Sequence, residues 1–260
     1  MPLIITNIIT KKIPMKTIIT FLIVVLLTSN VRIIQGQTKV TFKAEDGLMV
    51  TADEYIAENA TRYIILCHQA GYSRGEYSET AKRLNKLGFN CLAVDLRSGG
   101  EINGIKNETA ALAASSGKPA SYLDAEQDIN AAIEYAFEKS GSRNVILLGS
   151  SYSASLVLKV GKENDKVSAI IAFSPGEYFD KKLDVAAAVY GLSKPVWVTS
   201  TQKEVPDVNS IMKGIKSKNK VQYIPTGEGV HGSKALWKSQ AGNEEYWIKL
   251  IPFLDSIRNL

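Results

Sequence analysis

The sequence predicts an α/β fold, in which a mostly parallel, doubly wound sheet carries helices on both faces and begins with an antiparallel hairpin. Apolar runs of strand length alternate with segments of helical period along most of the chain. Strands separated by helices need right-handed crossover connections, which place the strands in one parallel sheet. The 260 residues, of which 45% are hydrophobic, suffice for one sizeable core. We therefore expect a single domain over residues 38–260.

Residues 1–37 are predicted to be a leader that precedes this domain. From Met15, a basic start runs into the apolar stretch 17–28 (TIITFLIVVLLT), which is typical of an export signal. This stretch is shorter than the roughly 20 apolar residues that a membrane span needs. Gly36 offers a small residue for cleavage, and either Met1 or Met15 is the start of the chain. We expect an exported protein, periplasmic or secreted, with an uncleaved membrane anchor as the alternative.

The charge of the chain argues against a nucleic-acid partner. The formal net charge of +5 falls to +1 when the four basic residues of the leader are left out. The remaining Lys and Arg alternate with Asp and Glu, whereas nucleic-acid binding proteins concentrate their positive charge. We expect neither a nucleic acid nor, beyond the export signal, a membrane as partner.

The two cysteines are predicted to remain unpaired. Cys67 ends one apolar run and Cys91 begins the next. In two parallel strands the thiols then lie toward opposite ends, beyond the reach of a disulfide. Two Cys and two His at such separations also suggest no metal site.

The elements are expected in the following order. Runs 40–42 and 48–52 flank the turn sequence Glu45-Asp46-Gly47 and predict the hairpin. The remaining runs are assigned by their length and period. They predict strands over 63–67, 90–96, 144–148, 167–172, 195–199 and 221–224, and helices over 77–87, 122–139, 154–163 and 244–258.

Residues 97–121 do not fit this alternation. They are rich in Gly, Asn, Ser and Ala and show no clear apolar period. We expect a long surface loop near the carboxyl edge of the sheet. Loops of this length often carry function, and a spacer without function is the alternative.

An apolar strand that turns directly into a helix gives the strongest local signal. The sequence VILLGSSYSA at 145–154 places Gly149 and Ser153 two positions before and after Ser151. Small residues are needed there because neighbouring backbone comes close to such a turn; Ser150 would instead have bulky residues at both positions. The pattern resembles the nucleophile elbow of α/β-hydrolases, with Ser153 in place of the usual glycine. Ser151 is the candidate nucleophile, and a serine-rich strand-to-helix turn without a chemical role or a phosphate-binding turn is the alternative.

The segment 65–71 (ILCHQAG) is a strand that runs into a loop. It is similar to the His-Gly loop that follows the third strand of α/β-hydrolases, with Gln69 where that family usually has glycine. The resemblance implies an oxyanion hole made of two backbone N–H groups, one from this loop and one from the residue after the nucleophile. By position these belong to Ala70, or to Gln69, together with Tyr152. His68 is interpreted as a structural residue of the loop.

A serine hydroxyl is a weak nucleophile near neutral pH and needs a base, which is normally histidine. His231 follows directly after the last predicted strand, 221–224. This is where α/β-hydrolases carry their catalytic histidine. His231 is therefore the candidate general base, with a surface histidine of no role as the alternative.

The third member of such a site is a carboxylate that orients the imidazole, and in α/β-hydrolases it lies between the serine and the histidine in the chain. Glu204 follows the predicted strand 195–199 and matches the position of that family's acid. Asp207 is the close competitor, and Glu177 and Asp180 after the preceding strand are further options.

These motifs stand at the ends of the expected strands, in the order of α/β-hydrolases, over residues 39–260. The resemblance is to the serine esterases of this superfamily, and the compact form is similar to the dienelactone-hydrolase-like branch. It implies cleavage of an ester or related acyl bond of a small molecule, through a catalytic triad and an acyl-enzyme, with no cofactor. A catalytically silent binding protein of the same fold is one alternative. An acyltransferase or a peptidase with the same triad is the other.

Overall fold

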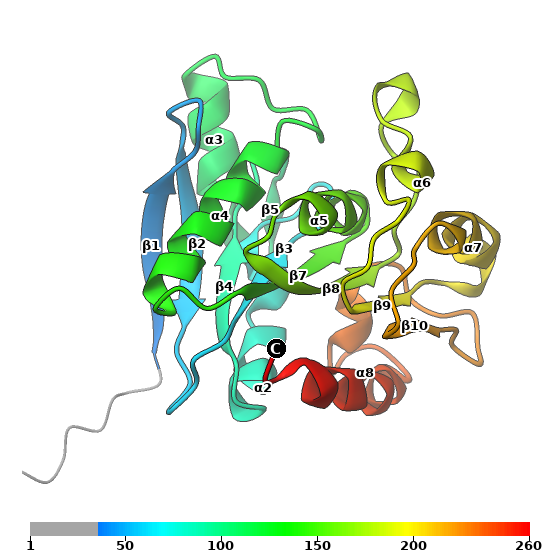
Figure 1. Cartoon of the computed structure of the whole chain (residues 1–260). Coiled ribbons are helices and arrows are strands. Elements are labelled where there is room, and N and C mark those ends of the chain that lie inside the picture. Colours follow the sequence, from blue (N-terminus) through cyan, green and yellow to red (C-terminus); the bar gives the residue numbers. More distant parts are fainter. Residues whose placement is uncertain (1–35) are drawn as a thin grey trace, which may run out of the picture. The chain divides into compact units, whose positions relative to one another are not determined.

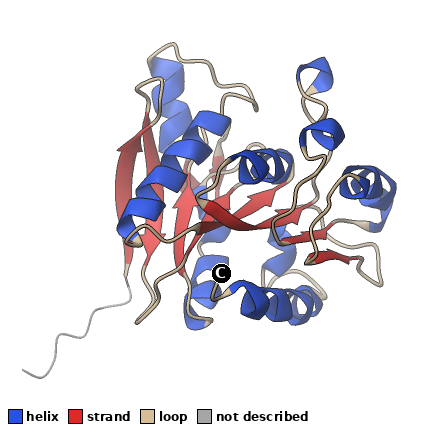
Figure 2. Ribbon diagram, viewed as in Figure 1, coloured by secondary structure: helices blue, strands red, loops and turns tan. Residues whose placement is uncertain are grey.

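The computed structural model describes residues 36–260, so nearly all of the leader predicted for residues 1–37 lies outside the described residues. Eight strands form one sheet in the order β1-β2-β4-β3-β7-β8-β9-β10 (Figure 1, Figure 2). The strands pair in parallel, except β1 with β2 and β2 with β4. This order confirms the predicted doubly wound sheet with an antiparallel start.

Each predicted strand and helix forms, with its ends shifted by a few residues. The strands of the sheet are β1 (Gln37–Lys43), β2 (Met49–Tyr55), β3 (Tyr63–Cys67), β4 (Asn90–Val94), β7 (Val145–Ser150), β8 (Val167–Phe173), β9 (Val196–Thr199) and β10 (Lys220–Tyr223). The helices are α2 (Thr80–Lys86), α3 (Glu108–Ser115), α4 (Glu126–Lys139), α5 (Tyr152–Glu163), α6 (Val185–Ala188), α7 (Val205–Lys213) and α8 (Asn243–Ile257). Short 3-10 helices are η1 (Arg74–Tyr77), η2 (Asp180–Lys182), η3 (Gln202–Glu204) and η4 (Ser233–Leu236).

The predicted turn closes the hairpin between β1 and β2. Gly47 has a φ of 87°, a conformation that glycine adopts without steric cost. The amide of Leu48 donates to the Asp46 carboxylate at 3.1 Å. The turn thereby sets the antiparallel register in which Gln37 lies opposite Tyr55.

Helices cover both faces of the sheet, which is why its central strands are buried at every position and mostly apolar. All residues of β3 and β7 are buried. Successive residues of β3 enter different clusters: Ile65 packs on the face of α4 and α5, and Ile64 packs on the face of α2 and α8. In Figure 1, α4 and α5 lie on one side of the sheet and α2 and α8 lie on the other.

The two cysteines are free and buried, as predicted. In the parallel pair of β3 and β4, Cys91 lies opposite Ile64 and Cys67 lies opposite Val94. The thiols also belong to the apolar clusters of opposite faces. Burial raises the pKa of both thiols well above the usual range, so both stay protonated.

The segment 97–121 is more ordered than predicted. It contains a short hairpin, β5 (Glu101–Ile102) with β6 (Ile105–Lys106), followed by helix α3. The Asn107 side chain caps α3 by accepting from the amide of Ala110 at 2.7 Å. The expectation of an irregular loop was wrong here, because an alanine-rich segment with a good cap favours a helix without any apolar period.

Buried arginines fix this segment against the sheet. Arg97 is fully buried and pairs with Asp46 and Asp128, each at 2.8 Å. Arg74 pairs with Asp95 at 2.5 Å, and also with Glu108 at the start of α3. Removing one partner of a buried pair costs about 3–5 kcal/mol, because the other charge is left uncompensated. The segment is therefore tied to the edge where β3 and β4 end.

None of the helices within residues 36–260 combines the length and the hydrophobicity that crossing a membrane requires.

Candidate active site

Ser151 occupies a sharp turn between β7 and α5. Its backbone has a φ of 58° and a ψ of −123°, which is strained for a residue other than glycine. A Cβ atom at Gly149 would lie 2.5 Å from the carbonyl oxygen of Ser153, so only glycine fits there. Such a turn raises the serine side chain above the carboxyl edge of the sheet.

The structure explains why serine replaces glycine at position 153. The buried Ser153 hydroxyl accepts from the amide of Ser150 at 2.9 Å. It also lies 2.7 Å from the carbonyl oxygen of Cys67, to which it donates. Ser153 therefore joins the turn that carries Ser151 to the end of β3, where the next loop of the site begins.

His231 lies in the loop after β10, and its side chain is 37% exposed. Its Nδ1 atom is 2.5 Å from Oε1 of Glu204. Glu204 closes η3, which begins after β9, and the Thr201 amide donates to its Oε2 at 2.9 Å in a capping box. The fold therefore brings together His231 and Glu204, the two residues that the sequence placed after different strands.

Hydrogen bonds hold the Glu204 carboxylate in its charged form. Burial by itself raises its pKa, but hydrogen bonds from His231, Thr201 and Ser174 outweigh this effect and lower the pKa to about 2. A carboxylate that stays ionised near neutral pH can orient an imidazole and stabilise its cation.

Ser174 was not among the sequence candidates, although it directly follows β8. Its hydroxyl donates to Glu204 Oε2 at 2.8 Å and accepts from the amide of Gly232 at 3.1 Å. It has a φ of 54°, and the preceding residue, Phe173, accepts from the amide of Ser151 at 2.8 Å. Ser174 thus connects the carboxylate, the histidine loop and the serine turn.

The other acidic candidates lie elsewhere. Asp207 is exposed on the first turn of α7, and Asp180 is exposed in η2. Glu177 accepts from the amides of Val185 and Ala186 at 2.7 and 2.9 Å, so it caps α6. Of the four carboxylates proposed from the sequence, the structure brings Glu204 to His231.

The serine turn and the histidine loop are also in direct contact. The amide of Ser233 donates to the hydroxyl of Ser150 at 2.8 Å. Within the described residues no hydrogen bond joins the Ser151 hydroxyl to His231. In ligand-free enzymes such contacts are often long and tighten when substrate binds.

Backbone amides face the site from two sides. Tyr152 is the first residue of α5, and neither its amide nor that of Ala70 donates to any atom of residues 36–260. The amide of Gln69, in contrast, donates to the Glu76 carboxylate at 2.8 Å. The Gln69 amide is thus engaged within the protein, whereas the amides of Ala70 and Tyr152 are not.

His68 is fully buried and supports this loop. Its Nε2 atom accepts from the amide of Leu96 at 2.9 Å, and its Nδ1 atom is 2.8 Å from the carbonyl oxygen of Gln69. Burial lowers the pKa of His68 to about 4 against these hydrogen bonds. His68 is therefore neutral near pH 7 and lies inside the fold.

A small cavity lies beside Tyr122 and Tyr178. Tyr178 lines it, and the Tyr178 hydroxyl donates to the carbonyl oxygen of Ser174 at 2.9 Å. Burial raises the pKa of Tyr178. Tyr122 stacks on Tyr152 at 4.3 Å between ring centroids. The cavity has a volume of about 110 Å³ and is lined by Ser121, Tyr122, Leu123, Tyr178, Phe179, Asp180 and Lys182.

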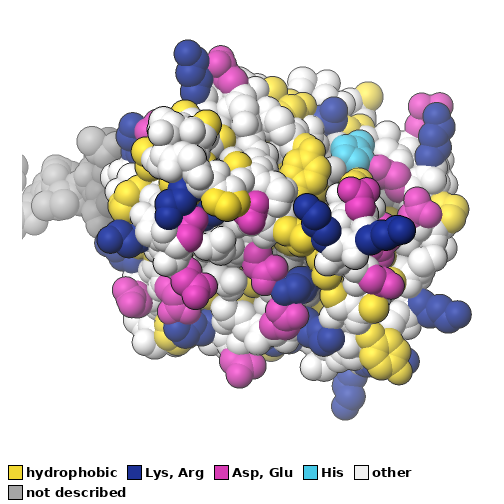
Figure 3. All heavy atoms as spheres, turned by 90° about the horizontal axis from the view of Figure 1, so that it is seen from above, with side chains coloured by type: hydrophobic (Ala, Val, Ile, Leu, Met, Phe, Trp, Pro, Cys, Tyr) yellow, Lys and Arg dark blue, Asp and Glu magenta, His cyan; other side chains and the backbone are white. Residues whose placement is uncertain are grey.

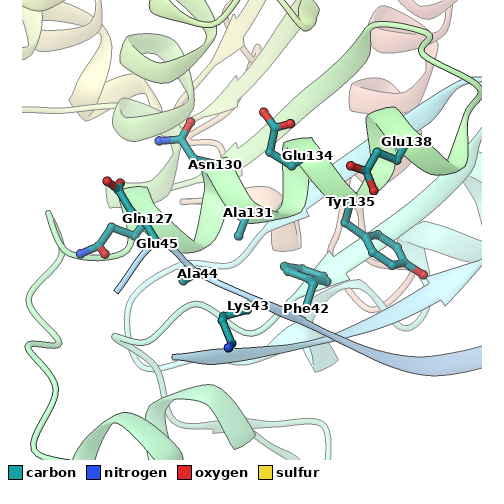
Figure 4. A pocket seen from close by; sticks show the side chains of 10 residues that line it. All are labelled: Phe42, Lys43, Ala44, Glu45, Gln127, Asn130, Ala131, Glu134, Tyr135 and Glu138. Atoms are coloured by element: carbon teal, nitrogen blue, oxygen red, sulfur yellow. The ribbon is translucent and has the colours of Figure 1, made fainter. Parts of the chain in front are cut away.

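A larger groove of about 470 Å³ runs between the end of β1 and α4 (Figure 4). Phe42 and Tyr135 stack at 5.1 Å within it. None of the candidate residues lines this groove. We therefore place the site at the carboxyl edge of the sheet.

The surface shows charges of both signs. In Figure 3, Lys and Arg side chains are interspersed with Asp and Glu, and histidine reaches the surface beside acidic and hydrophobic side chains. Within residues 36–260, no three His, Cys, Asp or Glu side chains gather in a way that could hold a metal ion.

Comparison with known proteins identifies the family of the chain. The family model described as serine aminopeptidase, S33, matches residues 58–225, which include Ser151 and Glu204 and end before His231. No curated protein matches the chain.

Solved structures share the fold at low sequence identity. An esterase of Pyrococcus furiosus is 18% identical, with a TM-score of 0.68 over 86% of this chain and 93% of that one. A dienelactone hydrolase of Anabaena variabilis is 13% identical, with a TM-score of 0.67 over 85% and 98%. A monoacylglycerol lipase of Paleococcus ferrophilus is 14% identical, with a TM-score of 0.55 over 85% and 99%. The family match spans more than half of the chain, which therefore belongs to the serine aminopeptidase, S33, family and is an α/β-hydrolase.

Proposed function

We propose that the protein is a serine hydrolase that cleaves an ester or related acyl bond through Ser151, His231 and Glu204. The observation that carries this proposal is the hydrogen bond between His231 and a charged Glu204, in a loop that contacts the turn of Ser151. A histidine held in this way can accept a proton from a serine hydroxyl and return it to a leaving group.

The reaction proceeds in two steps. The Ser151 oxygen attacks the carbonyl carbon while its proton passes to His231, and the charge that develops on the carbonyl oxygen is bound by the amides of Ala70 and Tyr152. These donors are already oriented, so they stabilise the transition state more than the substrate. His231 then protonates the leaving alcohol. Water, activated by His231, hydrolyses the acyl-enzyme in the same manner.

Esters are the preferred substrates in this proposal. The solved structures of similar fold named above are an esterase, a dienelactone hydrolase and a lipase, all of which cleave esters. A cavity of about 110 Å³ is lined by Tyr122, which stacks on Tyr152, the residue after Ser151, and so small a volume suits a short acyl group. The family's description makes a peptide bond at an amino terminus the second candidate substrate.

The experiment is a comparison of p-nitrophenyl acetate, p-nitrophenyl octanoate and an amino-acid p-nitroanilide as substrates of the purified protein. We expect hydrolysis of the acetate, slower hydrolysis of the octanoate, and no release of p-nitroaniline. Ser151→Ala should abolish activity. Ser168→Ala is the matched control, because the Ser168 hydroxyl donates a hydrogen bond to the carbonyl oxygen of Val145, at the amino end of β7 and away from the proposed site. A preference for the anilide would replace the ester proposal with the peptidase one.

We also propose that the protein acts after export, a proposal that rests on the apolar stretch 17–28. Its test is the intact mass of the mature protein from its native cells. An amino terminus at residue 37 in the soluble fraction is expected. A full-length chain in the membrane fraction would contradict export of a free protein.

A further inference from the structure

A glutamate that the sequence did not point to lies directly behind the proposed site. Glu76 belongs to η1 and is fully buried. Glu76 forms no salt bridge with any residue of 36–260, although burying a carboxylate is costly unless it is compensated. The hydrogen bonds that offset this cost indicate the role of Glu76.

Three hydrogen bonds are donated to the Glu76 carboxylate. The amide of Gln69 reaches Oε2 at 2.8 Å, and the hydroxyls of Ser150 and Ser233 reach Oε1 at 2.8 and 2.5 Å. All three partners are donors, which is the pattern that an ionised carboxylate accepts. Burial raises the pKa of Glu76, and these three bonds oppose the rise.

Each donor belongs to a different part of the proposed site. Gln69 precedes Ala70 in the loop after β3, and Ser150 precedes Ser151 in the turn after β7. Ser233 lies two residues after His231. One carboxylate therefore contacts the loop of the oxyanion donor, the turn of the nucleophile and the loop of the base.

The segments that contact this carboxylate also pack tightly against one another at Gly232. A Cβ atom at Gly232 would lie 2.4 Å from Oε1 of Gln69 and 2.7 Å from the hydroxyl of Ser150. The amide of Ser233 also donates to that hydroxyl at 2.8 Å. The three segments thus contact one another as well as Glu76, so a shift of one would disturb the others.

We propose that Glu76 is a positioning residue of the active site: its buried carboxylate holds the segments of Ala70, Ser151 and His231 in the geometry that acyl transfer needs. This inference rests on the proposed function. The physical reason is that the positions of catalytic groups must be fixed to within a fraction of an ångström. A misplacement of about 1 Å can lower the rate about 100-fold.

The chain provides a matched control for this residue. Glu79 lies three residues further along and also connects its segment to the chain after His231, since its carboxylate accepts from the amide of Lys238 at 2.8 Å. Glu79 is partly buried, and within residues 36–260 its carboxylate forms no hydrogen bond with the segments of Ser151 or Ala70. A substitution of Glu79 therefore tests whether loss of any hydrogen bond between this segment and the chain after His231 lowers the activity.

The experiment compares Glu76→Gln with Glu79→Gln in the full protein, with p-nitrophenyl acetate as substrate and thermal unfolding as a test of folding. We expect Glu76→Gln to lower kcat by about 100-fold with little change in KM, because the amide keeps the size of the side chain but loses its acceptor pattern. The rate of modification by a fluorophosphonate should fall in parallel. Glu79→Gln should keep both rates.

Ser233→Ala and Ser150→Ala keep the inference testable if Glu76→Gln does not fold. Each substitution removes one hydrogen bond to the carboxylate. Each should lower kcat by a smaller factor than Glu76→Gln does, again with little change in KM. An active parent whose Glu76→Gln and Ser233→Ala variants keep its kcat would overturn the positioning role alone. A folded parent without activity or modification would overturn the proposed function, and this inference with it.

Discussion

The two histidines of the chain each follow a parallel strand at the same edge of the sheet, yet their surroundings are opposite. His68, after β3, is fully buried and bonded to backbone groups of Leu96 and Gln69. His231, after β10, is 37% exposed and bonded to a carboxylate. Position at the sheet edge is therefore not sufficient for a chemical role.

What separates the two is the partner of the ring and its access to solvent. A neutral imidazole bonded to the backbone at two atoms satisfies buried polar groups and stabilises the fold. An imidazole with a carboxylate at Nδ1 and an accessible face can gain and lose a proton during a reaction. We therefore expect changes at His231 to affect activity and changes at His68 to affect stability.

The largest effect is expected from His231→Ala. The proposed reaction loses its base, so kcat should fall by about 1,000-fold or more. Because the side chain is partly exposed, the urea midpoint of unfolding should change little. Ester hydrolysis and urea unfolding, measured on the same preparation, check this. If His231→Ala lost stability as strongly as activity, the proposed difference in role between the two histidines would be contradicted.

Glu204→Gln should have the next largest effect. The amide keeps the shape but cannot stabilise an imidazole cation, and we expect a loss in kcat of about 100- to 1,000-fold. Asp207→Asn is the matched control, since Asp207 is exposed on the neighbouring turn and should keep the parent activity. Activity that depends on Asp207 instead would reassign the acid.

His68→Ala should destabilise the protein. The change leaves the amide of Leu96 without its acceptor in a buried site and opens a cavity, at a cost of about 3 kcal/mol. Denaturant unfolding measures this cost. Activity per folded molecule should fall far less than in His231→Ala, and a stability equal to that of the parent would contradict the supporting role of the ring.

A smaller effect concerns pH. The pKa of His68 is about 4 in the fold and about 6.5 in an unfolded chain. The unfolded state then binds more protons between these values, so the contribution of His68 is present above pH 6.5 and is lost as the pH falls toward 4. In His68→Asn the loss of stability over this window should be smaller than in the parent. An unchanged profile would show that other groups cause it.

Much of the fold was predictable because it depends on local patterns. Apolar runs gave the strands of the sheet, and the Gly149 to Ser153 pattern gave the strained turn of Ser151. Helix α3 was missed because its cap and alanine content, and not an apolar period, favour it. The short elements η2 and α6 carry too few residues for any period to show.

The site was less predictable because its support depends on contacts between distant residues. Glu204 could be proposed from its place after a strand, but its bond with Ser174 joins residues 30 positions apart. The contact between Glu76 and Ser233 spans 157 positions. No local sequence pattern identifies a serine or a glutamate as a partner in such a contact. Ser174, Glu76 and Ser233 could therefore be identified only from the three-dimensional structure.

The central claim is that Ser151 is activated by His231. Its most direct test is the intact mass of the protein after reaction with a fluorophosphonate, beside Ser151→Ala and His231→Ala. We expect one adduct on the parent, none on Ser151→Ala, and much slower modification of His231→Ala. A folded parent that stays unmodified, or an adduct that persists in Ser151→Ala, would contradict the claim.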